Sequence, residues 1–279
     1  MPDACTSAVL RDLSVYVSIA TALAIAGYWM LRRYRPGSAW NHEGQVLSRP
    51  YAMPDLVLLG ALGLFFIFAI EPQQAGGAGA DGGMSAGGLV ASMVLNLLVC
   101  AALLLYLHRM RGLNPAELFG LQHIHWRSLA LVVLVFTVII LISVNLVSAV
   151  AVKWLEEFWP DQQPQETVRA FRESGSIGFK FLVIVAAVVI APLAEETLFR
   201  GFVYGVLKRY TDAPFAALAS SLMFAVIHMH VGSLLPLCML AVLFCLAYEI
   251  TGCLLAPMLL HALFNGTSII GMMFLDAGG

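Results

Sequence analysis

The chain has 279 residues, of which 60% are hydrophobic and only 11% are charged, and its mean hydropathy is +0.86. Soluble globular chains carry about 25% charged residues, so this composition excludes a protein whose whole surface faces water. The formal net charge is −2, which gives no basic surface for nucleic acid. We therefore expect an all-α, polytopic membrane protein with the lipid bilayer as its main surroundings.

Eight apolar runs predict about eight transmembrane helices, because a hydrocarbon core of roughly 30 Å needs about 20 helical residues. The runs are 13–31, 55–70, 88–107, 129–151, 179–207, 214–230, 233–250 and 254–275. The second run is short. We divide the chain into a three-span region (1–128), a fourth span with an extracytoplasmic amphipathic loop (129–177), and a four-helix core (178–275).

The loops between these runs differ in charge. Segments 32–49 and 108–128 are rich in arginine, whereas the glycine-rich segment 71–87 has neither lysine nor arginine. The positive-inside rule then places both termini outside the cytoplasm, in a multi-pass protein of a bacterial-type plasma membrane. Segment 153–176 mixes tryptophan and phenylalanine with charges, which predicts a helix lying at the membrane interface.

Polar side chains are unevenly distributed within the spans. The first four spans hold no acidic or basic side chain far from their ends, but only the amides Asn96 and Asn145. The last four hold a group of ionisable and amide side chains: Glu195, Glu196, Arg200, His228, His261 and Asn265. Ionisable groups in lipid are costly and mark functional sites, so these six residues form the candidate site.

The segment APLAEETLFRGF (191–202) places two carboxylates in an apolar helix. Glu196 and Arg200 are four residues apart and share a helical face, which predicts an ion pair. Glu195 lies about 100° around the helix from Glu196. The two acids should therefore differ in role, with Glu195 left to face a cavity as a general acid or base.

His228 ends the segment FAVIH in the next span. A turn is predicted at 211–214, and Glu196 and His228 lie 16 residues before and after Asp212. In an antiparallel hairpin both side chains would lie roughly 24 Å from the turn, which favours contact between them. Gly232 and Ser233 follow closely, however, and would place His228 near the interface unless this span is tilted or incomplete.

The last span contains HALFN, in which His261 and Asn265 are again four residues apart. Together they can offer two hydrogen-bond donors to one point, as an oxyanion hole does.

The segments EETLFR, FAVIH and HALFN resemble the EExxxR, FxxxH and HxxxN motifs of the CAAX-prenyl-protease and bacteriocin-processing family of intramembrane proteases. The stretch TGCLLAPMLLHALFN is similar to the final motif region of that family, and the resemblance covers about residues 178–270. Each motif alone is unspecific. The three in this order, each within a predicted span, are specific.

The resemblance implies that the 178–275 core is catalytic and hydrolyses a peptide bond without a covalent intermediate. Glu195 and His228 would polarise the attacking water, and His261 and Asn265 would stabilise the oxyanion. Glu196 and Arg200 would hold the geometry and charge of the site, with Glu196 able to share the role of base. The substrate would be a membrane-anchored protein or peptide, prenylated or not, and no cofactor is expected.

Three other functions remain open from the residues. Two histidines and two carboxylates match the ligands of a His2Glu zinc or cobalt site, although HExxH is absent. A non-catalytic scaffold or immunity protein could keep the same fold. A proton-coupled transporter could use the acids and His228 as a relay, but no internal repeat supports it.

Overall fold

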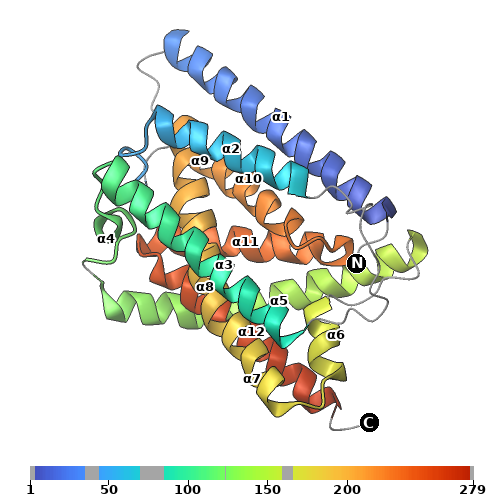
Figure 1. Ribbon diagram of the computed structural model, residues 1–279. Coiled ribbons are helices and arrows are strands. Elements are labelled where there is room, and N and C mark those ends of the chain that lie inside the picture. The colour runs from blue at the N-terminus through green and yellow to red at the C-terminus, as the bar shows by residue number, and fades with distance from the viewer. Residues whose placement is uncertain (1–3, 35–43, 70–84, 123, 159–165, 277–279) are drawn as a thin grey trace.

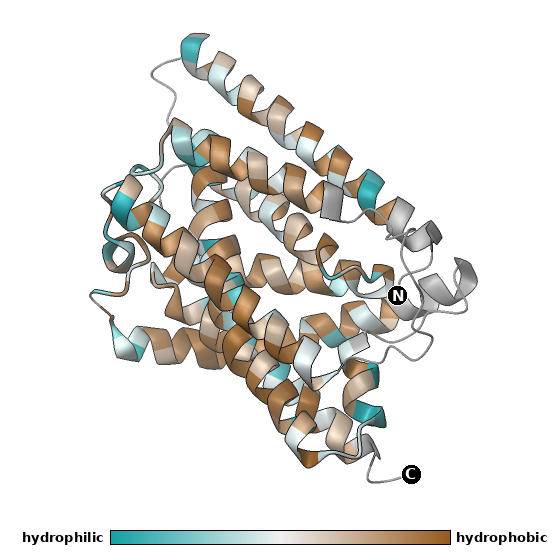
Figure 2. Ribbon diagram, viewed as in Figure 1, coloured by the Kyte–Doolittle hydropathy of each residue, from teal (hydrophilic) through white to brown (hydrophobic). Residues whose placement is uncertain are grey.

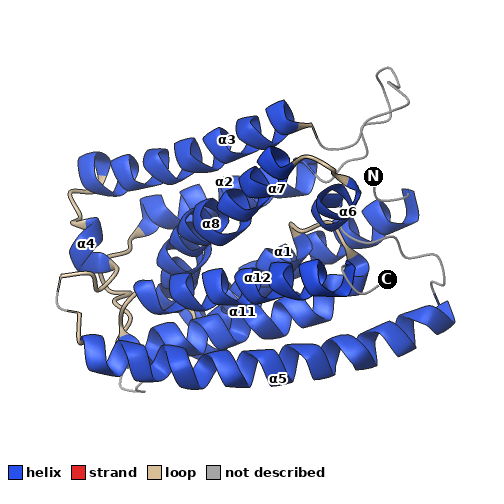
Figure 3. Ribbon diagram, turned by 90° about the horizontal axis from the view of Figure 1, so that it is seen from below, coloured by secondary structure: helices blue, strands red, loops and turns tan. Residues whose placement is uncertain are grey.

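The computed structural model describes residues 4–34, 44–69, 85–122, 124–158 and 166–276. These residues form helices and connecting loops, with no strand among them (Figure 3). The all-α expectation is confirmed. Most of the glycine-rich segment 71–87, and part of the arginine-rich segment 32–49, lie outside the described residues.

The N-terminal part of the chain contains α1 (Ala4–Tyr34), α2 (Met53–Ala69), α3 (Ala86–Leu105), η1 (Tyr106–Met110), α4 (Pro115–Leu118), α5 (Trp126–Phe158) and α6 (Glu166–Glu173). The C-terminal part contains α7 (Ile177–Val185), η2 (Ala186–Ile190), α8 (Ala191–Glu196), η3 (Thr197–Tyr204), α9 (Gly205–Tyr210), α10 (Ala213–Val226), α11 (Val231–Thr251) and α12 (Leu255–Asp276). Segments η1, η2 and η3 are π-helical.

Six helices in the described part of the chain are long and apolar enough to cross a membrane. They are Val9–Leu31, Ala86–Met110, Trp126–Ala151, Ile177–Tyr210, Val231–Thr251 and Leu255–Phe274. Two of the eight predicted spans are shorter apolar helices, Met53–Ile67 and Ala213–Val226. The protein is thus an integral, multi-pass membrane protein, but the number eight is not confirmed.

Helix α10 is short: it has 14 residues, from Ala213 to Val226. A helix of this length spans about 21 Å, less than the roughly 30 Å of a bilayer core. The sixth predicted span is therefore incomplete as a helix, and His228 follows its last turn.

Apolar side chains cover the outside of the bundle as well as its interior. Leu131, Leu134, Ile142 and Leu146 of α5 are each more than 60% exposed. In Figure 2, hydrophobic residues recur along the ribbons of the long helices. Such a surface is compatible with lipid and not with water.

The segment Ile177–Tyr210 runs through the middle of the bundle as one interrupted helix of 34 residues. It lies between α3 and α12 in Figure 3, and α10 packs against its second half. Helix α5 packs against α11 and α12, while α1 covers α10 and α2 covers α9 (Figure 1). The N-terminal helices therefore support the central helix and the C-terminal helices from outside.

The prediction of one interfacial helix over 153–176 does not match the helix bounds in the structure. Helix α5 continues to Phe158, and the separate helix α6 covers only Glu166–Glu173. Residues 159–165 between them lie outside the described part. The apolar period of α5 continues past Ala151, so its first charged residues extend the same helix and do not begin a new one.

Candidate active site

The predicted ion pair between Glu196 and Arg200 is present. Arg200 Nη1 donates to Glu196 Oε1 over 3.1 Å. The side chain of Glu196 is 0% exposed and that of Arg200 is 1% exposed. Breaking such a pair from one side leaves an uncompensated buried charge. The pair fixes the second acid of the EE segment as a buried structural anion.

Arg200 is held by aromatic and backbone groups in addition to its carboxylate. Its guanidinium carbon lies 4.5 Å from the ring centre of Phe224 and 5.2 Å from that of Phe244. Its Nη2 donates to the Ala241 carbonyl oxygen over 3.3 Å. Cation–π contacts of this kind strengthen when water is excluded. Helices α10 and α11 thus hold the cation in place around Glu196.

His261 of α12 joins this pair from the opposite direction. Its Nδ1 lies 2.8 Å from Glu196 Oε1, and its ring is buried against Phe244 with centroids 5.3 Å apart. A carboxylate only accepts hydrogen bonds, so Nδ1 carries the proton and donates it to Glu196. This contact fixes the orientation of the imidazole and directs Nε2 toward Glu195.

Glu195 has a different environment from Glu196, as predicted. Its side chain is 21% exposed, and its Oε2 lies 3.9 Å from His261 Nε2. That oxygen is buried and has no hydrogen-bond partner among the described groups. A separation of 3.9 Å is too long for a direct hydrogen bond. Glu196 Oε2 is also buried without a hydrogen-bond partner, but Glu196 is paired with Arg200 through its other oxygen. Glu195 is therefore the acid of the two that does not pair with Arg200 among the described residues.

His228 lies just beyond the end of α10, in the turn before α11. Its Nδ1 is 2.8 Å from the Phe224 carbonyl oxygen, which can only accept, so Nδ1 carries a proton and Nε2 takes no part in this contact. Its ring packs on that of Phe224 with centroids 4.7 Å apart, and Phe224 also contacts His261 at 6.0 Å. Phe224 therefore connects His228 to the group around Glu196.

Asn265 contacts the central helix at a different level. Its Nδ2 donates to the Ala187 carbonyl oxygen, in η2, over 2.7 Å. One amide N–H is therefore used by the protein, and one remains for another acceptor. His261 and Asn265 both face the segment Ile177–Tyr210, one at α8 and the other at η2.

The structure thus brings Glu195, Glu196, Arg200 and His261 into one group. His228 reaches that group through Phe224, and Asn265 through the backbone of η2. The catalytic roles assigned to these residues stay predictions.

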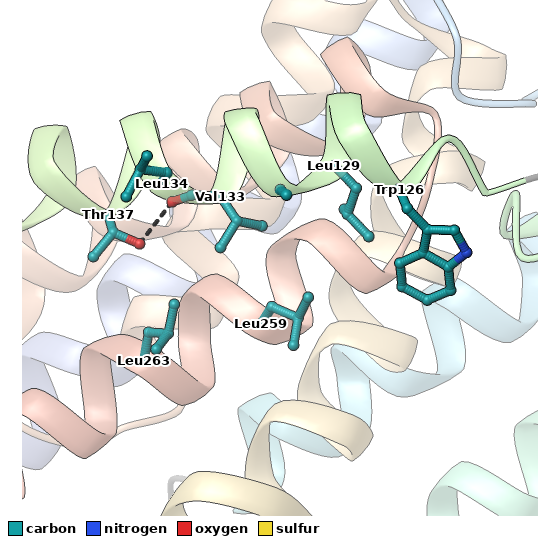
Figure 4. A pocket seen from close by; sticks show the side chains of 8 residues that line it. Trp126, Leu129, Val133, Leu134, Thr137, Leu259 and Leu263 are labelled. Carbon is teal, nitrogen blue, oxygen red and sulfur yellow. Dashed lines mark hydrogen bonds between the residues drawn. The ribbon is translucent and has the colours of Figure 1, made fainter.

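An apolar groove lies on the outside of α12, away from the histidine. It has a volume of about 530 Å³ and lies between α5 and α12, where Trp126, Val133, Leu259 and Leu263 line it (Figure 4). Leu259 and Leu263 are two residues before and after His261 and so lie on the opposite helical face. The groove contains none of the six candidate residues.

A metal centre was the main chemical alternative. Among the described residues, no three or more histidines, cysteines, aspartates and glutamates are grouped so that they could hold a metal ion. In the candidate site, Glu196 Oε1 is already occupied by Arg200 and His261. Whether the protein needs a metal stays a prediction for experiment.

Residues 177–267 match the model of a protein family described as "Type II CAAX prenyl endopeptidase Rce1-like". This segment is similar to that family, and the resemblance inferred from the three motifs is confirmed. All six candidate residues lie within the matched residues. Residues 1–176 lie outside the match.

A curated relative agrees with this assignment. "Putative membrane peptidase YdiL" of Bacillus subtilis (strain 168) is 29% identical over 89 residues. Those residues are 32% of this chain and 36% of that protein, so the similarity spans about a third of each. No solved structure gave a significant match.

Several residues around the candidate site were not found from the sequence. Phe244 packs on both Arg200 and His261, and the Ala241 carbonyl binds Arg200. Phe244 and Ala241 are uncharged and belong to no motif. Only their position one turn apart on the neighbouring helix α11 could have indicated that they contact the site. Pro192 lies three residues before Glu195, in the segment APLAEE. Its effect on the backbone hydrogen bonds depends on the π-helical register of η2, which the sequence does not indicate.

Proposed function

We propose that this protein is an intramembrane endopeptidase that hydrolyses a peptide bond of a membrane-anchored protein or peptide. The observation that carries the proposal is the group of Glu195, Glu196, Arg200 and His261, in which Glu196 pairs with Arg200 and His261, whereas Glu195 is partly exposed and faces the other nitrogen of His261. The Rce1-like family match supports a protease at the level of the family.

In the proposed reaction, a water molecule attacks the carbonyl carbon of the scissile peptide bond. Glu195 accepts a proton from that water, and the lone pair of His228 Nε2 supports the same step. The new C–O bond forms while the carbonyl π-bond opens to an oxyanion. General bases placed in this way contribute about 10²–10⁴ in rate.

The oxyanion needs donors that are already in position. In the proposal these are the protonated Nε2 of His261 and the second N–H of Asn265, and removing one such donor costs roughly 10²–10³ in kcat. The C–N bond then breaks, and the proton held by Glu195 or His261 goes to the leaving amine. The site is left with the same charge as before.

The test compares cleaved membrane proteins and peptides from cells that carry wild type, Glu195→Gln or Glu117→Gln. Glu117 is an exposed glutamate of α4 and serves as the matched control. We expect products with wild type and with Glu117→Gln, and none with Glu195→Gln at equal protein level. Products from purified Glu195→Gln would overturn the proposal. Biological activity that survives without cleavage would point to a scaffold.

A further inference from the structure

The π-helical segment η2 leaves one backbone carbonyl without its usual partner. Ala191 N–H donates to the Ala186 carbonyl, five residues earlier, and so sets the π register. The next donor in that register would be residue 192, which would bind the Ala187 carbonyl. Residue 192 is proline and has no N–H. The π register therefore ends at Pro192 and leaves the Ala187 oxygen unbonded by the helix.

Asn265 occupies this vacant carbonyl. Its Nδ2 lies 2.7 Å from Ala187 O, and the two residues are 78 positions apart in the chain. A backbone carbonyl at membrane depth that the helix leaves unbonded needs another donor, because water is absent from the hydrocarbon region. The amide nitrogen, not the amide oxygen, must face the carbonyl, since only the nitrogen can donate. The contact thus fixes which way the Asn265 amide is turned.

The orientation matters for the remaining groups of the amide. When one N–H of the planar amide is fixed on Ala187, the direction of the second N–H follows. The Asn265 side chain is part-buried, and His261 projects from the same face of α12 one turn earlier. The second N–H is therefore a directed donor next to the imidazole.

We infer that Pro192 is a positioning residue: by withholding a backbone N–H, it frees the Ala187 carbonyl to orient the Asn265 amide for oxyanion binding. This inference rests on the proposed function for its consequence in catalysis, but the hydrogen bond itself does not. Pro192 touches no reacting atom and acts only through Asn265.

The key experiment separates the missing N–H from the shape of the proline ring. Pro192→Ala supplies an N–H that competes for the Ala187 carbonyl. Pro192→lactic acid, introduced as a backbone ester, has the same methyl side chain but again lacks the N–H. Pro236→Ala, within α11, is the matched control for removal of a proline from inside a helix.

For cleavage, we expect Pro192→Ala to lower kcat roughly tenfold with KM unchanged, less than complete loss of an oxyanion donor. The ester variant and Pro236→Ala should keep wild-type kcat. An ester variant as slow as Pro192→Ala would overturn the inference, because the ring and not the absent N–H would then matter. Wild-type kcat in Pro192→Ala would also overturn it.

A second readout does not depend on cleavage. In protein labelled with ¹⁵N-asparagine, one Asn265 amide proton should exchange slowly, with Asn265→Ala giving the assignment. Pro192→Ala should speed that exchange roughly tenfold, as expected for loss of one hydrogen bond, and the ester should not. If wild type cleaves nothing, the proposed function fails, while this exchange pattern still supports or overturns the positioning of the amide by Pro192.

Discussion

His261 Nε2 lies 3.9 Å from Glu195 Oε2, a spacing at which a polar contact can be bridged by water. The imidazole is already fixed from its other side by Glu196. An acid and a base that face each other without a direct bond can exchange a proton with a third molecule placed between them. The two glutamates of the EE segment thus contact opposite nitrogens of the same imidazole, at different distances.

The first prediction is that Glu195→Gln and Glu196→Gln have opposite phenotypes. Glu195→Gln should abolish cleavage. It should change the free energy of unfolding only a little, as expected for a substitution of a partly exposed side chain. Glu196→Gln should destabilise the fold by about 3–5 kcal/mol, because Arg200 then keeps its buried charge without a partner. Cleavage assays and unfolding in mixed micelles measure the two effects.

Glu117→Gln, on the exposed surface of α4, should change neither quantity. Equal loss of stability in both site variants would mean that the acids act as one structural unit, against the division of roles proposed for them.

The second prediction concerns His228. His228→Ala should lower kcat by at least the roughly 10² expected of a general base, while KM changes little. Phe224→Leu keeps most of the apolar volume but removes the aromatic face that His228 and Arg200 share, so it should lower both kcat and stability. His125→Ala, on an exposed loop, is the control. Full kcat in His228→Ala would remove this residue from the proposed mechanism.

Part of the site follows directly from sequence. The Glu196–Arg200 pair is predictable because i, i+4 spacing in an apolar helix leaves the two charges no better partner. The turn before α10 is equally clear, since Asp212 caps the helix by accepting from Phe215 N–H and Pro214 follows in the first turn. Both features depend on neighbours within five residues.

Other features depend on packing between distant segments and could not be predicted. Lys208 looks like a loop cation in the sequence, yet it is fully buried and pairs with Glu249 of α11 and the Val46 carbonyl. Nothing near Lys208 in sequence indicates that residues 44–51 fold back over the end of α9. The contact between Asn265 and the Ala187 carbonyl of η2 is similarly absent from any local pattern, because the two residues are 78 positions apart.

The third prediction addresses the metal alternative. Cleavage by purified protein should be unchanged after incubation with EDTA or 1,10-phenanthroline, because Glu196 Oε1 is used by Arg200 and His261. A glutamate held in this way is a poor ligand for zinc, which binds deprotonated, available groups. Loss of activity that added Zn²⁺ or Co²⁺ restores would instead establish a metal-dependent protease.

The fourth prediction tests the buried ion pair at the end of the central helix. Lys208 binds Glu249, whose carboxylate also accepts from the Tyr204 hydroxyl. Lys208→Met and Glu249→Gln should each reduce the free energy of unfolding, and the double variant should lose less than the sum. An interaction energy of roughly 0.5–3 kcal/mol is expected for contacting residues. Additive effects would show that the pair does not act as a unit.

The fifth prediction concerns Tyr51, whose hydroxyl donates to the Gly201 carbonyl of η3 over 2.5 Å. Its ring packs so closely on Gly205 that a Cβ there would lie 2.4 Å from Tyr51 Cε2. Burial, with smaller contributions from Tyr248 and Asp55, raises the pKa of Tyr51 well above its usual value. The folded protein therefore favours the protonated phenol, and the hydroxyl ties the loop before α2 to the π segment that carries Arg200.

Tyr51→Phe should lower stability by about 1 kcal/mol near neutral pH, the value of one hydrogen bond. The raised pKa means that, above about pH 10, the unfolded chain loses the phenol proton while the folded protein keeps it, so stability falls as pH rises. Tyr51→Phe should lose less stability than wild type between neutral and strongly alkaline pH. Tyr16→Phe, on an exposed face of α1, is the control. Identical alkaline curves for wild type and Tyr51→Phe would contradict a buried, protonated Tyr51.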